Sequence, residues 1–165
     1  MFFPNIIITY LYGAPIVLRF YMQMRLFEAH DFPIYQSWFQ DPWLQQALGP
    51  MDEDWLSYIL QDKTGAQFSF LEKEALNCVI GLTWASETHP ENIITDIAVR
   101  PDLRGHGLGK QALNLLISQQ QNGHPWIAYV EQNNSKAAAF FDRLGWQKSM
   151  EDMLRFTYYT FTSNR

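Results

Sequence analysis

Cysteine is almost absent from this sequence, because Cys78 is the only one among 165 residues. The chain therefore forms no internal disulfide, and we expect it in a reducing compartment, the cytoplasm. Cys78 lies in an apolar run, so we expect a core residue and not a nucleophile. The four histidines, at positions 30, 89, 106 and 124, lack the spacing of metal ligands, and we expect no metal site.

Basic residues are also few. Lysine and arginine number 12 against 17 aspartates and glutamates, which gives a net charge of -5. A chain of this balance lacks the basic surface that nucleic acid requires, so we expect no nucleic-acid partner. The acidity is compatible with a cationic acceptor, although solubility alone also explains it. Apolar residues at 47% and charged residues at 18% predict a folded globule, and the length predicts one domain.

Charge is missing altogether from the first 18 residues, which are mostly apolar and are interrupted by Pro4, Gly13 and Pro15. This stretch is too short and too broken for a membrane-spanning helix, and it lacks the basic start of a signal peptide. We expect no stable membrane insertion. Three interpretations remain: an extra strand or packing arm, a weak membrane contact, or residues added by a start codon placed too early. We favour an arm or a start-site artefact for residues 1–22, followed by one domain over residues 23–165.

The centre of the chain combines a strand, a glycine-rich loop and a helix. The β-branched run Ile93–Val99 favours a buried strand, and Pro101 ends it. The loop Arg104–Gly109 has glycine at every second position, which lets backbone N–H groups approach a ligand closely. The helix that follows has one apolar face, formed by Leu108, Ala112, Leu115 and Leu116. A glycine loop that leads into a helix N-terminus predicts an anion site, most often for phosphate.

The spacing of the glycines excludes two common phosphate loops. A dinucleotide-binding loop needs G-x-G-x-x-G, whereas the loop here reads G-x-G-x-G. A P-loop needs a glycine five positions before Gly109 and Ser or Thr after Lys110, but Arg104 and Gln111 stand there. What remains is the pattern Arg104-x-x-Gly107-x-Gly109.

The other segments predict an α/β protein with a mixed sheet. We expect further strands at Met24–Glu28, Gln67–Glu72, Asn77–Ser86, Pro125–Val130 and Met153–Phe161. We expect a first helix from Ala29 to Phe39, which Asp41-Pro42 ends, and a second over Trp55–Leu60, which the acidic residues Asp52–Asp54 precede. A third helix is expected to begin at a cap formed by Asn133–Ser135 and to end at Gly145. Gly81, inside a strand, predicts a bulge or a close contact.

Two motifs resemble the GCN5-related N-acetyltransferase (GNAT) superfamily. The loop matches its [QR]-x-x-G-x-[GA] pattern, and Asn134 to Trp146 matches N-x-x-A-x-x-x-Y-x-x-x-G-[FW] except at the tyrosine. The resemblance extends from about residue 24 to residue 161. It implies a mixed, mostly antiparallel sheet flanked by helices and splayed between the fourth and fifth strands, here Ile93–Val99 and Trp126–Val130.

The resemblance also implies an activity. We expect an acetyl-CoA-dependent N-acetyltransferase that moves the acetyl group to a primary amine by direct attack in a ternary complex. Strand backbone would hold the pantetheine, the glycine loop the pyrophosphate, and Asn134 the pantetheine end. The implied cofactor-binding residues are Ile97, Ala98, Val99, Arg104, Gly105, His106, Gly107, Leu108, Gly109, Lys110 and Asn134.

The acceptor stays open at this stage. An aminoglycoside-like amine, a polyamine, an amino acid and a protein N-terminus all fit the resemblance, as does a homodimer. Four tryptophans could line an aromatic acceptor cleft, but such residues more often belong to a core; they are Trp38, Trp43, Trp55 and Trp84.

The family tyrosine that often protonates the departing thiolate corresponds to Phe141, which has no proton to give. Ser135, Tyr129 or a water molecule would then act as the acid, or the thiolate would leave unaided, since thiols ionise near neutral pH. The alternative is a catalytically silent acyl-CoA-binding module.

Asp96 is the expected general base, because the attacking amine must lose a proton and aspartate is unusual inside a strand. Strict alternation would place its side chain on one face with Ile94 and Ala98. A structural carboxylate, hydrogen-bonded to neighbouring strands, is the competing interpretation. Weaker candidates for the base are Glu87, His89 and Glu131.

Overall fold

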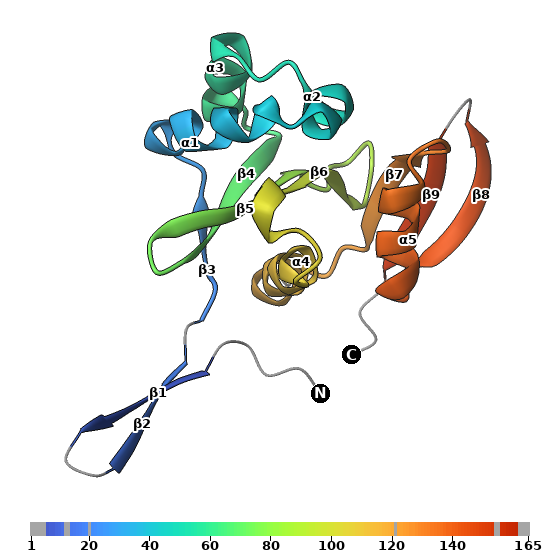
Figure 1. Cartoon of the computed structure of the whole chain (residues 1–165). Coiled ribbons are helices and arrows are strands. Elements are labelled where there is room, and N and C mark those ends of the chain that lie inside the picture. The colour runs from blue at the N-terminus through green and yellow to red at the C-terminus, as the bar shows by residue number, and fades with distance from the viewer. Residues whose placement is uncertain (1–5, 12–13, 20, 121, 154–155, 162–165) are drawn as a thin grey trace.

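A seven-stranded sheet forms the centre of the computed structural model, which describes residues 6–11, 14–19, 21–120, 122–153 and 156–161 (Figure 1). Its strands are β3 (Gln23–Leu26), β4 (Gly65–Glu72), β5 (Ala75–Thr83), β6 (Asn92–Val99), β7 (Trp126–Glu131), β8 (Gln147–Met153) and β9 (Phe156–Phe161). They lie in the order β3-β4-β5-β6-β7-β9-β8, and only the β6–β7 pair is parallel. The predicted mixed, mostly antiparallel sheet is confirmed.

The N-terminal stretch contains a separate antiparallel pair, β1 (Ile6–Leu11) and β2 (Ala14–Arg19). Met22, just after it, already packs against the main core of the domain. No helix within the described ranges has the length and apolar character needed to cross a membrane.

Two groups of helices cover opposite faces of the sheet. On one face lie α1 (Phe32–Ser37), α2 (Pro42–Leu48) and α3 (Glu53–Gln61), with the 3-10 turns η1 (Ala29–Asp31) and η2 (Trp38–Gln40). On the other face lie α4 (Leu108–Gln119), preceded by the 3-10 turn η3 (Pro101–Leu103), and α5 (Ser135–Arg143). Apolar side chains therefore fill two separate cores, one on each side.

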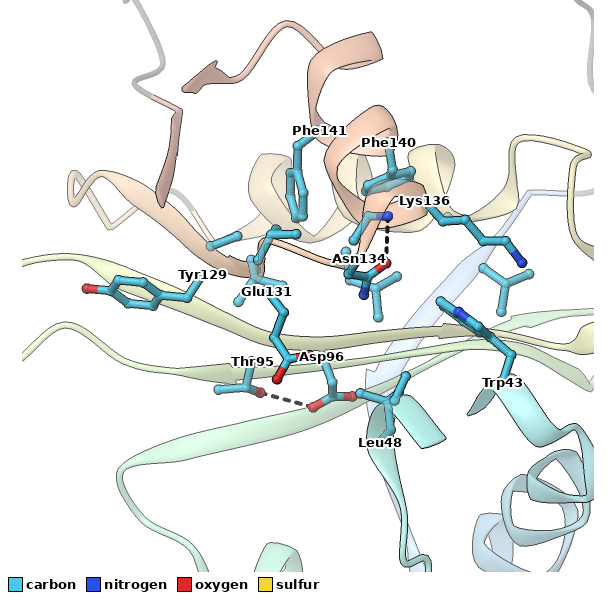
Figure 2. A pocket seen from close by; sticks show the side chains of 18 of the residues that line it. Trp43, Leu48, Thr95, Asp96, Tyr129, Glu131, Asn134, Lys136, Phe140 and Phe141 are labelled. Carbon is cyan, nitrogen blue, oxygen red and sulfur yellow. Dashed lines mark hydrogen bonds between the residues drawn. The ribbon is translucent and has the colours of Figure 1, made fainter. Parts of the chain in front are cut away.

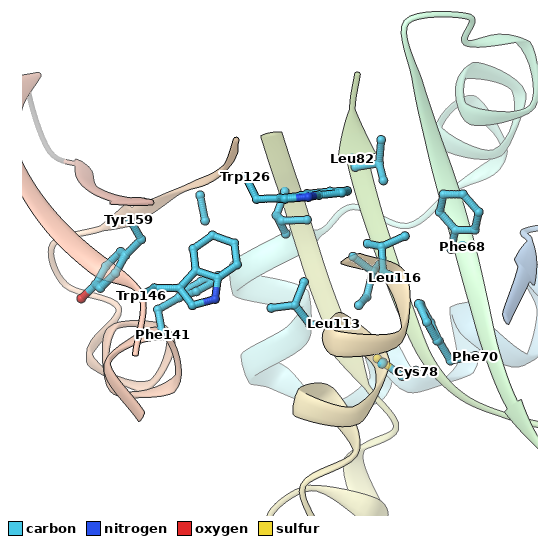
Figure 3. Close-up of a cluster of buried hydrophobic side chains, with 14 of the residues drawn as sticks. Phe68, Phe70, Cys78, Leu82, Leu113, Leu116, Trp126, Phe141, Trp146 and Tyr159 are labelled. Carbon is cyan, nitrogen blue, oxygen red and sulfur yellow. The ribbon is translucent and has the colours of Figure 1, made fainter. Parts of the chain in front are cut away.

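The larger core lies between the sheet and helices α4 and α5 (Figure 3). It buries Leu113 and Leu116 of α4 against Trp126 of β7 and contains Cys78, which confirms the expectation that this cysteine is a core residue. Burial also raises the pKa of the Cys78 thiol, which leaves it inert. The smaller core joins Tyr35 and Leu44 of the first helices to the opposite side of the sheet.

Two elements differ from the sequence-based expectations. Asp41-Pro42 ends one helical segment but also begins α2, because proline suits the first turn of a helix and the Asp41 carboxylate accepts a hydrogen bond from the Leu44 N–H at 2.9 Å. Strand β8 was missed, because its sequence, Gln147–Met153, has no apolar alternation; antiparallel pairing with β9 holds it at the sheet edge. The expected strand Met153–Phe161 is present from Phe156, and residues 154–155 lie outside the described residues.

The sheet splays between β6 and β7, as the resemblance implies. The two strands pair only from Asn92 opposite Trp126 to Ile94 opposite Ala128, and their later residues diverge. β6 also bulges, since Gly81 pairs with Asp96 while the next residue of β5, Leu82, pairs with Ile94. The bulge predicted at Gly81 is therefore confirmed, with Thr95 as the extra residue on β6.

The bulge corrects one expectation from alternation. Ile94 belongs to the core under α4 and α5, whereas Ala98 belongs to the core under α1–α3. The two side chains therefore lie on opposite faces, because the extra residue Thr95 inverts the alternation. Asp96 lies on the Ala98 side of the sheet, where it contacts Gln67 of β4.

Candidate active site

A cavity of about 490 Å³ opens where β6 and β7 part (Figure 2). Its walls come from β6, β7, α5 and α2, so it reaches both faces of the sheet through the splay. Its charged lining residues are Asp96, Arg104, Glu131, Lys136 and Arg143. The apolar wall includes Trp43, Leu48, Val99 and Phe140.

The glycine loop adjoins this cavity and leads directly into α4. Gly105 and Gly107 have φ values of 83° and 79°, in the left-handed region that glycine adopts without strain. Gly107 is the N-cap of α4, and no side chain caps the helix there. The first N–H groups of α4 are thus available to an anion, supported by the helix dipole. Gly109 packs so closely that an added Cβ would lie 3.3 Å from a Val99 methyl and 3.4 Å from the Phe140 ring.

The expected cofactor residues divide into two groups. Some line the cavity: Ile97, Val99, Arg104, Gly109 and Asn134. The others lie beside it: Gly105, His106, Gly107 and Lys110 are exposed on the loop and first turn, while Leu108 and Ala98 are buried on either side of β6. His106 turns its Nδ1 to the carbonyl of Leu103 at 3.2 Å, so it closes the loop on itself.

Arg104 is held by groups from α2. Its guanidinium donates to both Asp41 carboxylate oxygens, at 3.0 and 3.2 Å, and lies 5.2 Å from the centre of the Trp43 ring. The Lys136 ammonium of α5 lies 5.3 Å from the same ring. Trp43 therefore contacts two cations and joins three elements at the end of the cavity beside the glycine loop.

Asp96 lies two residues beyond Ile94, the last residue of β6 that pairs with β7. Its Oδ1 accepts a hydrogen bond from the Gln67 amide at 2.8 Å, and its Oδ2 accepts one from the Thr95 hydroxyl at 3.0 Å. Burial raises the pKa of the Asp96 carboxyl, and the hydrogen bonds from Gln67, Thr95 and the Gly81 backbone offset only part of this effect. A carboxylate with a raised pKa that lines a cavity is suited to accept a proton.

The other expected base candidates lie in different places. Glu131 lines the cavity, and Figure 2 shows its side chain extending from β7 toward Asp96 and Thr95. Glu87 and His89 lie in the loop between β5 and β6 and are not among the lining residues. No cluster of His, Cys, Asp or Glu within the described ranges has the arrangement of a metal site.

The residues considered for the role of general acid also lie in different places relative to the cavity. Phe141 is buried among aromatic rings, with centroids 5.3 Å from Tyr159 and 4.9 Å from Trp146, and it also lines the cavity. Tyr129 lines the cavity and is 51% exposed. Ser135 is exposed at the first position of α5 and is not among the lining residues. Asn134 beside it caps α5, since its Oδ1 accepts from the Ala137 N–H at 3.0 Å.

Sequence patterns did not point to the contribution of α2. Ala47 and Leu48 line the cavity, but α2 itself was not expected. Of the four tryptophans, Trp43 lines the cavity and Trp38 is buried in the smaller core. The Asp41-Pro42 pair, a typical helix start, was the available signal for α2.

Comparison with solved structures finds the same fold in several enzymes. An acetyltransferase from Thermus thermophilus superposes with a TM-score of 0.73 at 19% identity, over 85% of this chain and 96% of that one. The ribosomal-protein-S18-alanine N-acetyltransferase from Escherichia coli gives 0.62 at 18% identity, over 85% and 91%. A spermidine N-acetyltransferase from Vibrio cholerae, in complex with CoA and spermine, gives 0.65 at 15% identity, over 84% and 92%.

Comparison with curated proteins gave no match. The sequence itself, however, matches a family model over residues 32–146, a range that includes the glycine loop, the splayed strands and helix α5. The chain belongs to the acetyltransferase (GNAT) family.

Proposed function

We propose that this protein is an acetyl-CoA-dependent N-acetyltransferase that acetylates a primary amine by direct attack. The observation that supports this most is the position of Asp96. Its carboxylate has a raised pKa and lines the same cavity as Arg104 and Gly109 of the glycine loop. A base and an anion-binding loop thus meet at the gap between β6 and β7.

The splay leaves a place for the pantetheine arm of acetyl-CoA. β6 no longer pairs with β7 after Ile94, so the backbone groups of Ile97–Val99 on that side are free to bind the arm. The loop Arg104–Gly109 and the start of α4 would bind the pyrophosphate through N–H groups, with Lys110 on the outer turn. Asn134 lines the cavity on the opposite wall, near the pantetheine end.

The chemistry then needs few side chains. Asp96 accepts a proton from the acceptor ammonium, directly or through one water molecule, which frees the nitrogen lone pair. The amine nitrogen attacks the thioester carbonyl, a C–N bond forms, the C–S bond breaks, and the second proton of the nitrogen passes to water as the amide forms. Holding donor and acceptor together in one cavity supplies much of the acceleration.

The sulfur leaves as a thiolate, whose conjugate thiol has a pKa of roughly 8.5. Phe141 cannot protonate it. We propose that water protonates the thiolate, with Tyr129 as the second candidate because it lines the cavity. Ser135 is less favoured because it is exposed at the start of α5.

The similar solved structures support an amine acceptor. They include a spermidine N-acetyltransferase in complex with CoA and spermine and a ribosomal-protein-S18-alanine N-acetyltransferase. We further propose that the protein acts in the cytoplasm, in line with its single unpaired cysteine, and that residues 1–22 are an appendage to the domain.

Two measurements test the proposal. Calorimetric titration with acetyl-CoA, and with NAD and ATP as comparisons, should show binding of acetyl-CoA alone, in the micromolar range of about -8 kcal/mol. Release of free CoA thiol with a panel of amines should then show turnover. Binding without thiol release would favour the silent acyl-CoA-binding module, and absence of binding would overturn the proposal.

A matched pair of variants locates the cofactor. Gly105 and Gly145 have similar positive φ values, 83° and 76°, and open space around an added Cβ. Gly105→Ala and Gly145→Ala should therefore lose similar stability, about 1–2 kcal/mol. Only Gly105→Ala should weaken acetyl-CoA binding, because only Gly105 lies in the glycine loop.

A further inference from the structure

The sheet face that carries α1–α3 is left uncovered at its C-terminal strands. Side chains of a strand alternate between faces, so Tyr129 and Glu131 lie together, opposite the face of β7 that packs against α5 through Ala128 and Val130. Their partners across the β7–β9 ladder are Tyr158 and Phe156. Tyr129 is 51% and Phe156 38% exposed, so no helix among the described residues covers them.

This uncovered face forms one wall of a trough, and α2 forms the other. We define the aromatic trough by Ala47, Leu48, Asp96, Tyr129, Glu131, Phe156 and Tyr158. All of these except Tyr158 line the cavity, and Tyr158 extends the wall through its ring contact with Tyr129, at 5.4 Å between centroids. The trough is therefore continuous with the proposed site of transfer.

Charge is unevenly distributed along the cavity. Of the three basic groups in the described lining, Arg104 and Lys136 meet at Trp43, at the end beside the glycine loop, and Arg143 comes from the last turn of α5. The acidic groups of the described lining are Asp96 and Glu131, from adjacent strands at the trough end. A cation is therefore favoured beside these two carboxylates, while the rest of the trough offers aromatic and aliphatic surface.

We propose that the acceptor is a primary amine with a compact apolar or aromatic body, such as an arylalkylamine. This inference rests on the function proposed above and names the substrate class of that site. The ammonium lies between Asp96 and Glu131, and the apolar body packs on Tyr129 and Phe156. The charge of the two carboxylates and the apolar contact with the aromatic rings both favour this orientation.

The same arrangement disfavours a polyamine. A chain with several ammonium groups needs carboxylates spaced along its length, but the two acids of the described lining come from adjacent strands, and Glu131 extends toward Asp96 (Figure 2). Beyond them, the second ammonium of a polyamine would meet Tyr129 and Phe156 or the bases of the cofactor end. Glu131 and Tyr129 thus act as specificity-determining residues, and Asp96 remains the base.

The proposed substrate class is tested by initial rates of CoA thiol release with four acceptors: 2-phenylethylamine, ethylamine, spermidine and an alanyl tripeptide. We expect kcat/KM for 2-phenylethylamine to exceed that for each of the others by about tenfold or more. Preference for spermidine or for the tripeptide would overturn the inference while leaving the acetyltransferase function intact. Loss of acetyl-CoA binding, in contrast, would indicate failure of the proposed function.

Variants of Tyr129 distinguish contact of its ring with the acceptor from acid catalysis by its hydroxyl. Tyr129→Ala should raise KM for 2-phenylethylamine about tenfold and leave that for ethylamine nearly unchanged. Tyr129→Phe keeps the ring, so its KM for 2-phenylethylamine should rise far less than that of Tyr129→Ala; a fall in kcat for every amine would show that the hydroxyl acts as the acid. Tyr58→Ala, which removes a tyrosine 66% exposed on α3, is the matched control.

Glu131→Gln keeps the shape of the side chain but removes its charge. We expect KM for 2-phenylethylamine to rise about fivefold to tenfold while the acid limb of the pH–rate profile stays in place, because Asp96 still accepts the proton. An unchanged KM would exclude Glu131 from acceptor binding, and a lost acid limb would make Glu131 the base.

Discussion

Arg104 and Asp41 form a two-point ion pair although 63 positions separate them in the sequence. The pair joins the glycine loop to the start of α2, and the Asp41 carboxylate also caps that helix through the Leu44 N–H. These hydrogen bonds lower the pKa of Asp41. The glycine loop and the helix that forms one wall of the aromatic trough are thus connected through a single carboxylate.

Variants of Asp41 separate its two roles. Asn caps a helix about as well as Asp, so Asp41→Asn removes only the ion pair, whereas Asp41→Ala should lose about 1 kcal/mol more of unfolding free energy. Asp52 caps α3 in the same way, through the Trp55 N–H at 3.0 Å, and Asp52→Asn is the control. Urea unfolding should show a salt-dependent loss for Asp41→Asn only. Equal, salt-independent effects of the two Asn variants would contradict a contribution from the ion pair.

Asp31 is a buried carboxylate, 2% exposed, that links β3, β4 and the first helical turn. It accepts hydrogen bonds from Arg25 at 2.6 and 2.7 Å, from Ser69 at 2.8 Å and from the Glu28 N–H at 3.0 Å. Burial raises the pKa of Asp31, but these hydrogen bonds, first that from Arg25, outweigh it and lower the pKa.

A lowered pKa means that Asp31 stabilises the fold above the ordinary aspartate pKa of about 3.9 and that this stability is lost as pH falls through the lower, folded value. Asp31→Asn should cost roughly 1.5–3 kcal/mol at neutral pH and flatten the acid side of the stability curve. Ser69→Ala, which keeps the charge pair, should cost about 1 kcal/mol and preserve the pH dependence. If the unfolding free energy of Asp31→Asn still fell steeply at acid pH, the acid dependence would belong to another group.

The sequence predicted the elements that carry strong local signals. A β-branched run marked β6 and a short apolar run marked β7, while the glycine loop, Asn134 and Gly145 marked helix ends through their capping or backbone preferences. The glycine loop was found for the same reason, since the spacing of its glycines is itself a local sequence pattern.

Features that depend on distant contacts were not predictable. β8 is held by its partner β9 and not by its own polar sequence. Trp43 lines the cavity because α2 brings it to Arg104 and Lys136, far along the chain. The inverted alternation at Thr95 depends on its pairing with β5, and only the glycine at position 81 hinted at it.

Substitution of Asp96 should lower activity without lowering stability at neutral pH. Its raised pKa means that the folded chain holds this proton more firmly, so the stability it adds at low pH is lost as pH rises from about 3.9 through the folded value. Asp96→Asn should therefore be at least as stable as wild type at neutral pH while kcat falls about 10²–10⁴-fold and the acid limb of the pH–rate profile disappears. An unaltered profile would exclude Asp96 as the base.

Gly81 is expected to position Asp96, because the absence of a side chain at residue 81 leaves the space that the Asp96 carboxylate occupies. A Cβ at this position would collide with the Asp96 carboxylate and lie 2.5 Å from the Gln67 Oε1 and 2.6 Å from the Thr95 Oγ1. All three atoms end side chains that can move, so Gly81→Ala should fold but displace the carboxylate and lower kcat. In the Asp96→Asn background the same change should have little further effect on kcat, because both act on one group. Additive losses would show that Gly81 acts elsewhere.

Phe141 provides the sharpest test of how the thiolate leaves. Phe141→Tyr restores the hydroxyl that the family motif has at this position, on a ring that lines the cavity. Because a thiolate is a good leaving group near neutral pH, we expect kcat to change by less than about threefold, whereas a limiting general acid contributes about 10²–10⁴-fold. Phe141→Leu is the packing control: it loses the ring contacts with Tyr159 and Trp146, so its melting temperature should fall while acetyl-CoA still binds. A rise in kcat of Phe141→Tyr by about a hundredfold would show that protonation of the thiolate limits the natural enzyme, and that the phenylalanine slows it.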